Sequence, residues 1–173
     1  AQFDHVSADF SFTSTSIAPL RTGGDCTVMC VKNSSGLTLE PKRAVSFKAG
    51  TNYTEVAGYC TVTGKYPCGI VDEFCVNGVP SLDYFYVVIG GPVLALTDLA
   101  GADNNVITEG DPLIALTAAT SQCTTAGRVY SLPAAAGSTH LGTNLLGAFA
   151  YALSAKTTAN TNADLLIHLK RLL

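Results

Sequence analysis

The longest apolar runs in this chain are short, because glycine, proline or aspartate interrupts them after a few residues. The stretch 82–116, LDYFYVVIGGPVLALTDLAGADNNVITEGDPLIAL, shows this most clearly. It predicts a strand ending at Ile89, a break at Gly90-Gly91-Pro92, and further strands over 93–96 and 113–116. Valine, isoleucine, tyrosine and phenylalanine favour a pleated, half-buried surface, whereas glycine and proline mark turns. The stretch therefore predicts a compact β core, and none of its side chains looks like a reacting group.

Short strands are also predicted on both sides of this stretch. They cover residues 9–13, 26–32, 43–47, 56–63, 69–76, 128–130 and 164–173, where apolar residues alternate with polar ones or lie between turn signals. Asn77-Gly78 is the strongest hairpin signal in the chain. Residues 145–156 fit either a helix or a strand. The predicted fold is all-β, with a sandwich or barrel-like core of short antiparallel strands and an extended N-terminal arm.

The length of 173 residues favours one domain. We predict an N-terminal arm over residues 1–20 and a single β domain over 21–173. A weak internal echo leaves an alternative open, because 69–96 and 147–172 both run glycine, apolar strand, polar connection, apolar strand. Two related β units, about 21–116 and 117–173, would explain that echo.

Composition excludes several classes of function. Only 13% of the residues are charged while 47% are hydrophobic, so the surface should be neutral, small-featured and suited to close packing in an assembly. The net charge is −3 and no basic stripe occurs, so a nucleic-acid partner is not expected. No apolar run reaches the roughly 18 residues of a membrane span, and no membrane partner is expected. The first residues, AQFDHVSADF, do not predict a signal peptide, although a mature secreted chain would look the same.

The six cysteines are Cys26, Cys30, Cys60, Cys68, Cys75 and Cys123. Free, buried thiols are the favoured interpretation in a chain that can build a good core, with disulfides or a metal site as alternatives. The spacing contains no paired CxxC of a zinc ribbon. His5, His140 and His168 are too far apart in sequence to place two ligands on one face. No catalytic or nucleotide-binding motif occurs, so neither an enzyme, nor a cofactor, nor a metal is predicted.

One acidic loop has the character of a metal site. It contains Asp98, Asp103, Asn104, Asn105, Glu109 and Asp111, whose oxygens could ligate Ca²⁺. The EF-hand order is absent, and Asn and Asp also hydrogen-bond their own backbone in turns. The turn interpretation is therefore favoured.

The N-terminal segment is polar but carries spaced apolar residues, namely Phe3, Phe10, Phe12 and Ile17. One interpretation is an ordinary first strand of the sheet. The other is an arm that lies on a neighbouring subunit, in which case these four residues form a subunit interface.

Several motifs in the second part of the chain resemble one family. GPVLAL leads through a loop to the turn Gly-Asp-Pro-Leu at 110–113, then to TTAGRV at 124–129, and finally to the polar TTANTNAD and a terminal apolar strand. Over roughly residues 65–173 the chain resembles the capsid decoration, or cement, proteins of tailed bacteriophages. The motifs are turns and packing residues, and the family brings no catalytic residues to transfer.

The resemblance implies a structural virion protein. It would bind the outer face of the phage head and bridge major capsid protein subunits, with self-association as a dimer or trimer on the capsid. It would assemble in the cytoplasm of the bacterial host, where thiols stay reduced. The alternatives are a secreted β-sandwich binding module with disulfides and Ca²⁺ in the 98–111 loop and, more weakly, a hydrolase that uses His140 or His168.

Overall fold

The computed structural model describes residues 3–6, 26–60, 67, 69–97, 106–115, 125–131, 148–157 and 163–170. They form ten strands: β1 (Phe3–Val6), β2 (Cys26–Asn33), β3 (Ala44–Phe47), β4 (Glu55–Tyr59), β5 (Gly69–Val71), β6 (Tyr84–Leu96), β7 (Pro112–Ile114), β8 (Tyr130–Ser131), β9 (Ala150–Ala152) and β10 (Asp164–Leu169). These residues include no helix, and the predicted all-β fold class is confirmed. Within them, accordingly, no helix is long and apolar enough to cross a membrane.

Five strands close into a small ring, which we call the N-terminal barrel. Around the ring β2 pairs with β4, β4 with β3, β3 with β5, β5 with β6, and β6 again with β2. The barrel-like core is thus confirmed. One pairing that the sequence did not predict is parallel, between the ends of β2 and β4 at Lys32 and Asn33.

Alternate side chains of β2 and β6 fill this barrel. Phe85 and Val87 of β6 lie opposite Val31 and Met29 of β2. The rest of this core cluster is Leu39, Val45, Val56, Val71, Val79 and Ile89. Because successive side chains of a strand point to opposite faces, the neighbours of Phe85 on β6 point outward, away from this core.

β1 pairs with β2 beside the barrel, and β7 to β10 form with β6 a second ring, which we call the C-terminal sheet. The second half of β6 pairs with β10, β10 with β9, β9 with β7, and β7 with β8, all antiparallel. A parallel bridge between Thr97 and Val129 returns from the start of β8 to the end of β6. The strand predicted over 164–173 is present as β10 over Asp164–Leu169, with Leu165, Ile167 and Leu169 buried on one face. Residues 171–173 lie outside the described part of the chain.

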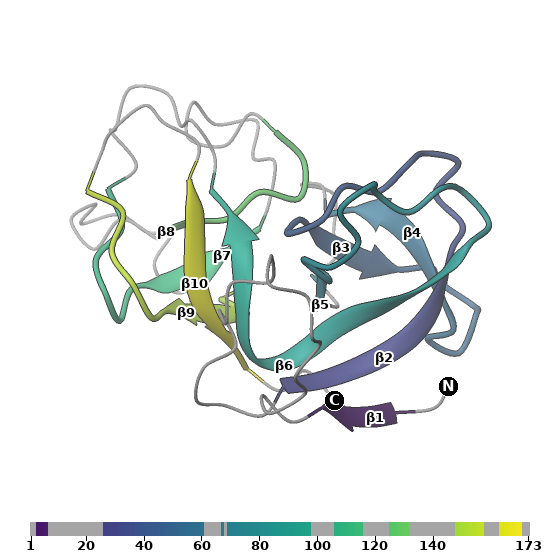
Figure 1. Ribbon diagram of the computed structural model, residues 1–173, viewed down its shortest axis with the longest axis horizontal. Helices are drawn as coiled ribbons and strands as arrows, with labels where there is room; N and C mark the ends of the chain where they lie inside the picture. The colour runs from purple at the N-terminus through teal and green to yellow at the C-terminus, as the bar shows by residue number, and fades with distance from the viewer. Residues whose placement is uncertain are drawn as a thin grey trace, which may run out of the picture.

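β6 belongs to both units and joins them (Figure 1). The predicted break at Gly90-Gly91-Pro92 is wrong, since β6 runs without interruption through all three residues. The strand changes partner there instead: Gly90 is the last residue paired with β2, and Gly91 is the first paired with β10. Gly91 has a φ of 85°, a conformation that favours glycine, so these residues turn the strand without ending it.

Two other sequence expectations change in the structure. The strand predicted over 69–76 ends at Val71, because Asp72 accepts the backbone N–H of Phe74 and starts a turn. The ambiguous segment 145–156 contains a strand, β9, and not a helix, in its described part. β9 is short and its apolar residues pack on β10 and β7, so tertiary pairing overrides the helical preference of alanine.

The two units share buried apolar residues. Val28, Ile70 and Val88 on the outer face of the N-terminal barrel belong to one core cluster with Val93 and Ile167 of the C-terminal sheet. An ion pair of 2.5 Å between Lys42 Nζ and Asp164 Oδ2 crosses the same junction. The division of the chain into an arm and one domain, or into two related units, stays a prediction.

Candidate partner-binding surface

The predicted interface residues lie mostly outside the described part of the chain. Phe3 belongs to β1, whose backbone pairs with β2 and places Phe3 opposite Met29. Phe10, Phe12 and Ile17, like the strand predicted over 9–13, fall in residues that the structure does not describe. The contact between the arm and a neighbouring subunit therefore stays a prediction.

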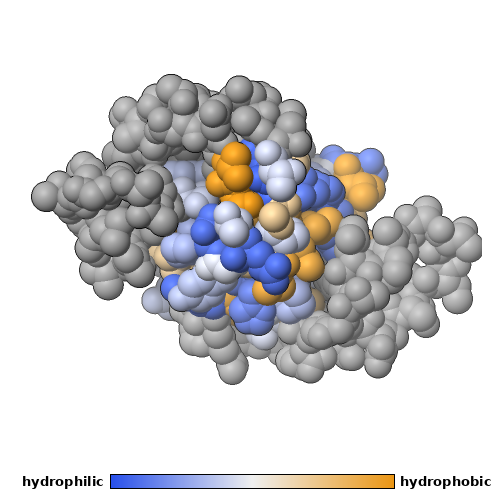
Figure 2. Space-filling view, turned by 90° about the vertical axis from the view of Figure 1, so that its left-hand side faces the viewer, coloured by the Kyte–Doolittle hydropathy of each residue, from blue (hydrophilic) through white to orange (hydrophobic). Residues whose placement is uncertain are grey.

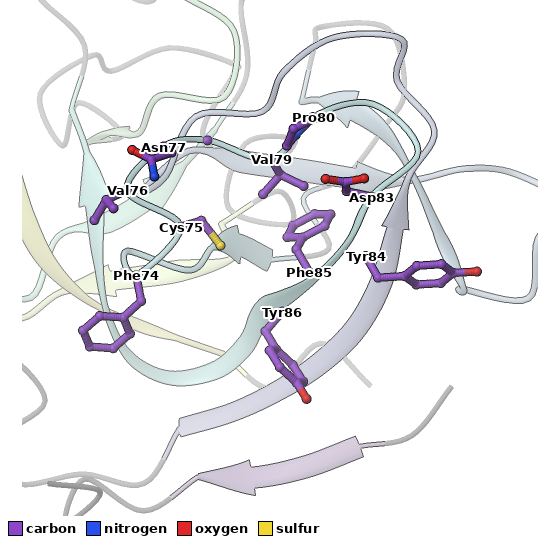
Figure 3. Close-up of a pocket in the computed structure, with 11 residues that line it drawn as sticks. Phe74, Cys75, Val76, Asn77, Val79, Pro80, Asp83, Tyr84, Phe85 and Tyr86 are labelled. Carbon is purple, nitrogen blue, oxygen red and sulfur yellow. The ribbon is translucent and has the colours of Figure 1, made fainter. Parts of the chain in front are cut away.

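Exposed apolar side chains gather at a place that sequence reasoning did not single out. Loop 72–83, which joins β5 to β6, and the first residues of β6 carry Phe74, Val76, Tyr84 and Tyr86, which are 42%, 75%, 71% and 48% exposed. Together with Asp83 they line a shallow groove of about 370 Å³ (Figure 3). We call this feature the aromatic groove.

The start of β6 explains how the groove acquires its tyrosines. In the segment Tyr84-Phe85-Tyr86 the strand alternates, so Phe85 packs into the barrel while both tyrosines point away from it, as Figure 3 shows. Because Tyr84 and Tyr86 are 71% and 48% exposed, a partner could cover about 180–300 Å² of their surface. The available signal in the sequence was this alternation of aromatics, which also fits an ordinary core strand.

A buried amide holds the loop that forms one wall of the groove. Asn33 is fully buried, and its Nδ2 donates to the carbonyl oxygens of Leu37, Val79 and Pro80 at 2.8, 2.9 and 3.0 Å. Its Oδ1 accepts the N–H of Ser35 at 3.0 Å. A primary amide has two hydrogens, so the three carbonyls share them. Asn33 thus links the end of β2 to the segment that leads into the groove.

The backbone at Leu82 is strained and also tied to Asn33. Leu82 has a φ of 76°, which is unusual for leucine, and its side chain is 64% exposed. The backbone N–H of Leu82 donates to the backbone carbonyl oxygen of Asn33 at 2.7 Å. The backbone N–H of Asn33 donates in turn to the backbone carbonyl oxygen of Asp83 at 2.8 Å. The left-handed conformation costs about 1–2 kcal/mol. The hydrogen bonds to Asn33 hold it and fix the direction in which Asp83 and Tyr84 leave the turn.

The electrostatics of the groove are one-sided. Of the described residues that line it, Asp83 is the one that carries a charge, and none is a lysine or an arginine. Asp83 is exposed and lines the groove. Burial, followed by the charge of Asp72, raises the pKa of the Cys75 thiol in the same wall. Cys75 is therefore protonated at neutral pH and is a poor nucleophile.

The structure brings no catalytic or metal-binding group together among the residues that it describes. In that part of the chain, no three His, Cys, Asp or Glu side chains are placed to hold a metal ion. His168 is exposed on β10 opposite Pro92 and Tyr151, while His5 and His140 have no described side chain. Within the predicted acidic loop, Asp111 Oδ2 accepts the N–H of Thr108 at 2.9 Å, as the turn interpretation requires. Asp98, Asp103, Asn104 and Asn105 lie outside the described residues.

Two of the cysteines that the structure describes agree with the free-thiol interpretation. Cys30 and Cys75 are free and partly buried, and Cys26 and Cys60 are buried in the core. Cys68 and Cys123 lie outside the described residues.

The C-terminal sheet lies at the end of the molecule away from the aromatic groove, and Figure 2 shows its surface. There the coloured apolar residues lie scattered among hydrophilic ones.

Comparison with known proteins places the fold. No family model and no curated protein matches the chain. Among solved structures it is similar to a chain of the capsid of Myoviridae phage XM1, with a TM-score of 0.53 and 17% identity over 86% of this chain and 85% of that chain. The N base of the head fiber gp8.5 of bacteriophage phi29 aligns with a TM-score of 0.47 and 13% identity, over 84% of this chain and 95% of that chain.

The fold is one found in a phage capsid. The resemblance to capsid-associated phage proteins that the sequence predicted is thereby confirmed at the level of the fold. The alignment with the XM1 capsid chain covers 86% of this chain, so it extends beyond residues 65–173, where the sequence motifs lie.

Proposed function

We propose that this chain is a capsid decoration protein, which binds the outer face of a phage head and bridges neighbouring major capsid protein subunits. The observation that carries the proposal is the shared fold with a chain of the XM1 capsid over most of both chains. The low charge of the sequence supports it, because a neutral surface packs closely in an assembly. In this role the protein is not an enzyme, and it acts only through the contacts that it makes.

The proposed mechanism is multivalent binding. A symmetric shell repeats the same weak site many times, and each copy that touches two or more subunits ties them together. Because the second contact forms within one complex, modest individual affinities add up to a stable lattice. Self-association as a dimer or trimer on the capsid would raise the number of contacts further. Assembly in the bacterial cytoplasm would keep Cys30 and Cys75 reduced.

The first prediction tests the proposed function directly. Shells of the phage that encodes this chain, assembled without it, should bind the purified protein at saturable, symmetry-related positions on their outer surface. Decorated shells should also lose their contents at a higher temperature than bare shells, because ligand binding to the intact state stabilises it. Cosedimentation and cryo-electron microscopy measure occupancy, and a thermal release assay measures stability. Absence of binding to mature shells would contradict the proposal.

The second prediction concerns the N-terminal arm. Deletion of residues 2–17 should abolish occupancy on the shell and leave the core folded. Because the deletion also removes β1, which pairs with β2, a sharper variant combines Phe10→Ser, Phe12→Ser and Ile17→Ser and retains β1. This variant should lose at least about tenfold in apparent affinity if the apolar residues anchor the arm. Full decoration by both variants would show that the arm is not the contact.

A further inference from the structure

We propose that the aromatic groove binds an extended protein segment in which arginine or lysine alternates with apolar residues, and that this segment belongs to the capsid subunit beneath the protein. The identity of the partner rests on the proposed function. The chemistry of the occupant rests on the groove itself, and the two can be tested separately.

The apolar part of the proposal comes from exposure. Phe74, Val76, Tyr84 and Tyr86 leave large apolar side chains in water around one groove, where their burial by a partner would release bound water. Tyrosine is also among the residues most enriched at binding hot spots, because it combines apolar area with a hydroxyl group and few rotatable bonds. A contiguous patch of exposed apolar side chains marks an interaction site, whereas single scattered apolar residues are normal on a protein surface.

The cationic part comes from charge complementarity. Among the described residues that line the groove, the exposed Asp83 is the one charged side chain, and no lysine or arginine accompanies it. Asp83 makes no side-chain ion pair within the described part of the chain. On the adjoining strand β2, Lys32 lies opposite Tyr84. The hydrogen bond from Ser34 lowers the pKa of Glu55, and the charge of Lys32 contributes to the same shift. A guanidinium group satisfies both features of the site, because it pairs with a carboxylate and stacks on an aromatic face.

The groove is also held in position before any partner arrives. The strained turn at Leu82 and the hydrogen bonds of Asn33 to Val79 and Pro80 fix the loop against the start of β6. Strain held by surrounding structure is a feature of ligand-binding segments, and pre-organisation lowers the entropic cost of binding. An extended segment suits the site because the groove runs between the loop and a strand.

The test on shells compares groove variants with matched controls elsewhere. Combined Tyr84→Ser and Tyr86→Ser should weaken binding by about tenfold or more. Asp83→Asn should weaken it by about two- to fivefold and should flatten the dependence on salt, since a screened ion pair is lost. Tyr151→Ser and Glu109→Gln, which remove an exposed tyrosine and an exposed carboxylate from the C-terminal sheet region, should stay within about twofold of wild type. Thermal melts confirm that each variant is folded.

A second readout does not depend on the shell. The peptide acetyl-Leu-Arg-Leu-Arg-Leu-amide, added to the isotope-labelled protein, should shift the NMR signals of Tyr84, Tyr86 and Asp83, and acetyl-Leu-Glu-Leu-Glu-Leu-amide should not. If wild type fails to bind shells but the arginine peptide shifts these signals, the proposed function falls and the groove chemistry stands. Unchanged shell binding by the groove variants overturns the groove as the contact. Shell binding could depend on the two tyrosines and yet be unchanged by salt and by Asp83→Asn. That result would indicate a neutral ligand, such as a glycan, and would overturn the proposal of a cationic occupant.

Discussion

Asn33→Asp should destabilise the protein by about 3–5 kcal/mol at pH 8. The substitution keeps the shape of the side chain but replaces the donor Nδ2 by an oxygen. That oxygen would face the carbonyl oxygens of Leu37, Val79 and Pro80, which Nδ2 now meets at 2.8–3.0 Å. The new carboxylate oxygen would therefore be buried against three carbonyl oxygens, with no hydrogen-bond donor in the place where the amide nitrogen now donates. In a chain of this size the loss corresponds to a drop in Tm of about 6–20 °C.

The stability of Asn33→Asp should depend on pH. Burial favours the neutral carboxylic acid, which can also donate one hydrogen bond. The stability deficit of Asn33→Asp relative to wild type should therefore shrink between about pH 8 and pH 4. Asn77→Asp makes the same chemical change at an exposed site in loop 72–83 and should cost less than about 0.5 kcal/mol. Urea unfolding at both pH values measures the difference, and equal stability of the two variants would show that the Asn33 network is unimportant.

Gly127→Ala should cost about 2–4 kcal/mol. A Cβ atom at this position would lie 2.7 Å from the backbone oxygen of Ala44 and 2.9 Å from Cδ1 of Tyr59. The residue also has a φ of 77°, which alanine adopts only with strain. The backbone oxygen of Gly127 accepts the N–H of Ala44 at 2.6 Å. The backbone of segment 125–131 therefore lies close to that of β3 where this segment leaves the N-terminal barrel for the C-terminal sheet. The alanine must push these units apart or break this contact.

Gly50→Ala is the control that separates the strain of the backbone conformation from the steric overlap of the added Cβ atom. Gly50 has a φ of 78°, nearly that of Gly127, but no atom lies within 4 Å of the position that a Cβ would take. Gly50→Ala should therefore cost only the conformational strain, about 1–2 kcal/mol. The difference between the two variants in urea unfolding measures the close packing at the junction. If the two alanines cost the same, the contact between Gly127 and Ala44 contributes nothing beyond the backbone conformation.

The candidate site was largely hidden from sequence reasoning. The spaced aromatics of the N-terminal segment drew attention to Phe3, Phe10, Phe12 and Ile17, because exposed apolar residues in a polar segment are visible in one dimension. The aromatic groove is not visible in that way. Phe74 and Tyr84 come from a turn and a strand that each look like ordinary core-forming sequence. Phe74 is exposed because the turn at Asp72 ends β5 early, and Tyr84 is exposed because β6 pairs so that Phe85 points into the barrel.

Local pattern by itself determined the strand-rich class of this protein, the presence of a strand where β10 lies and the absence of any recognisable catalytic motif. These depend on alternation and on residue type, which are properties of neighbours in the sequence. The barrel closure, the parallel β2–β4 pairing and the passage of β6 through Gly90, Gly91 and Pro92 were decided only by the tertiary structure. The physical reason is that glycine and proline weaken a strand locally, but pairing with β2, β5 and β10 supplies hydrogen bonds and burial from distant segments. Those contacts outweigh the local preference and turn a predicted break into the bend that joins the two units.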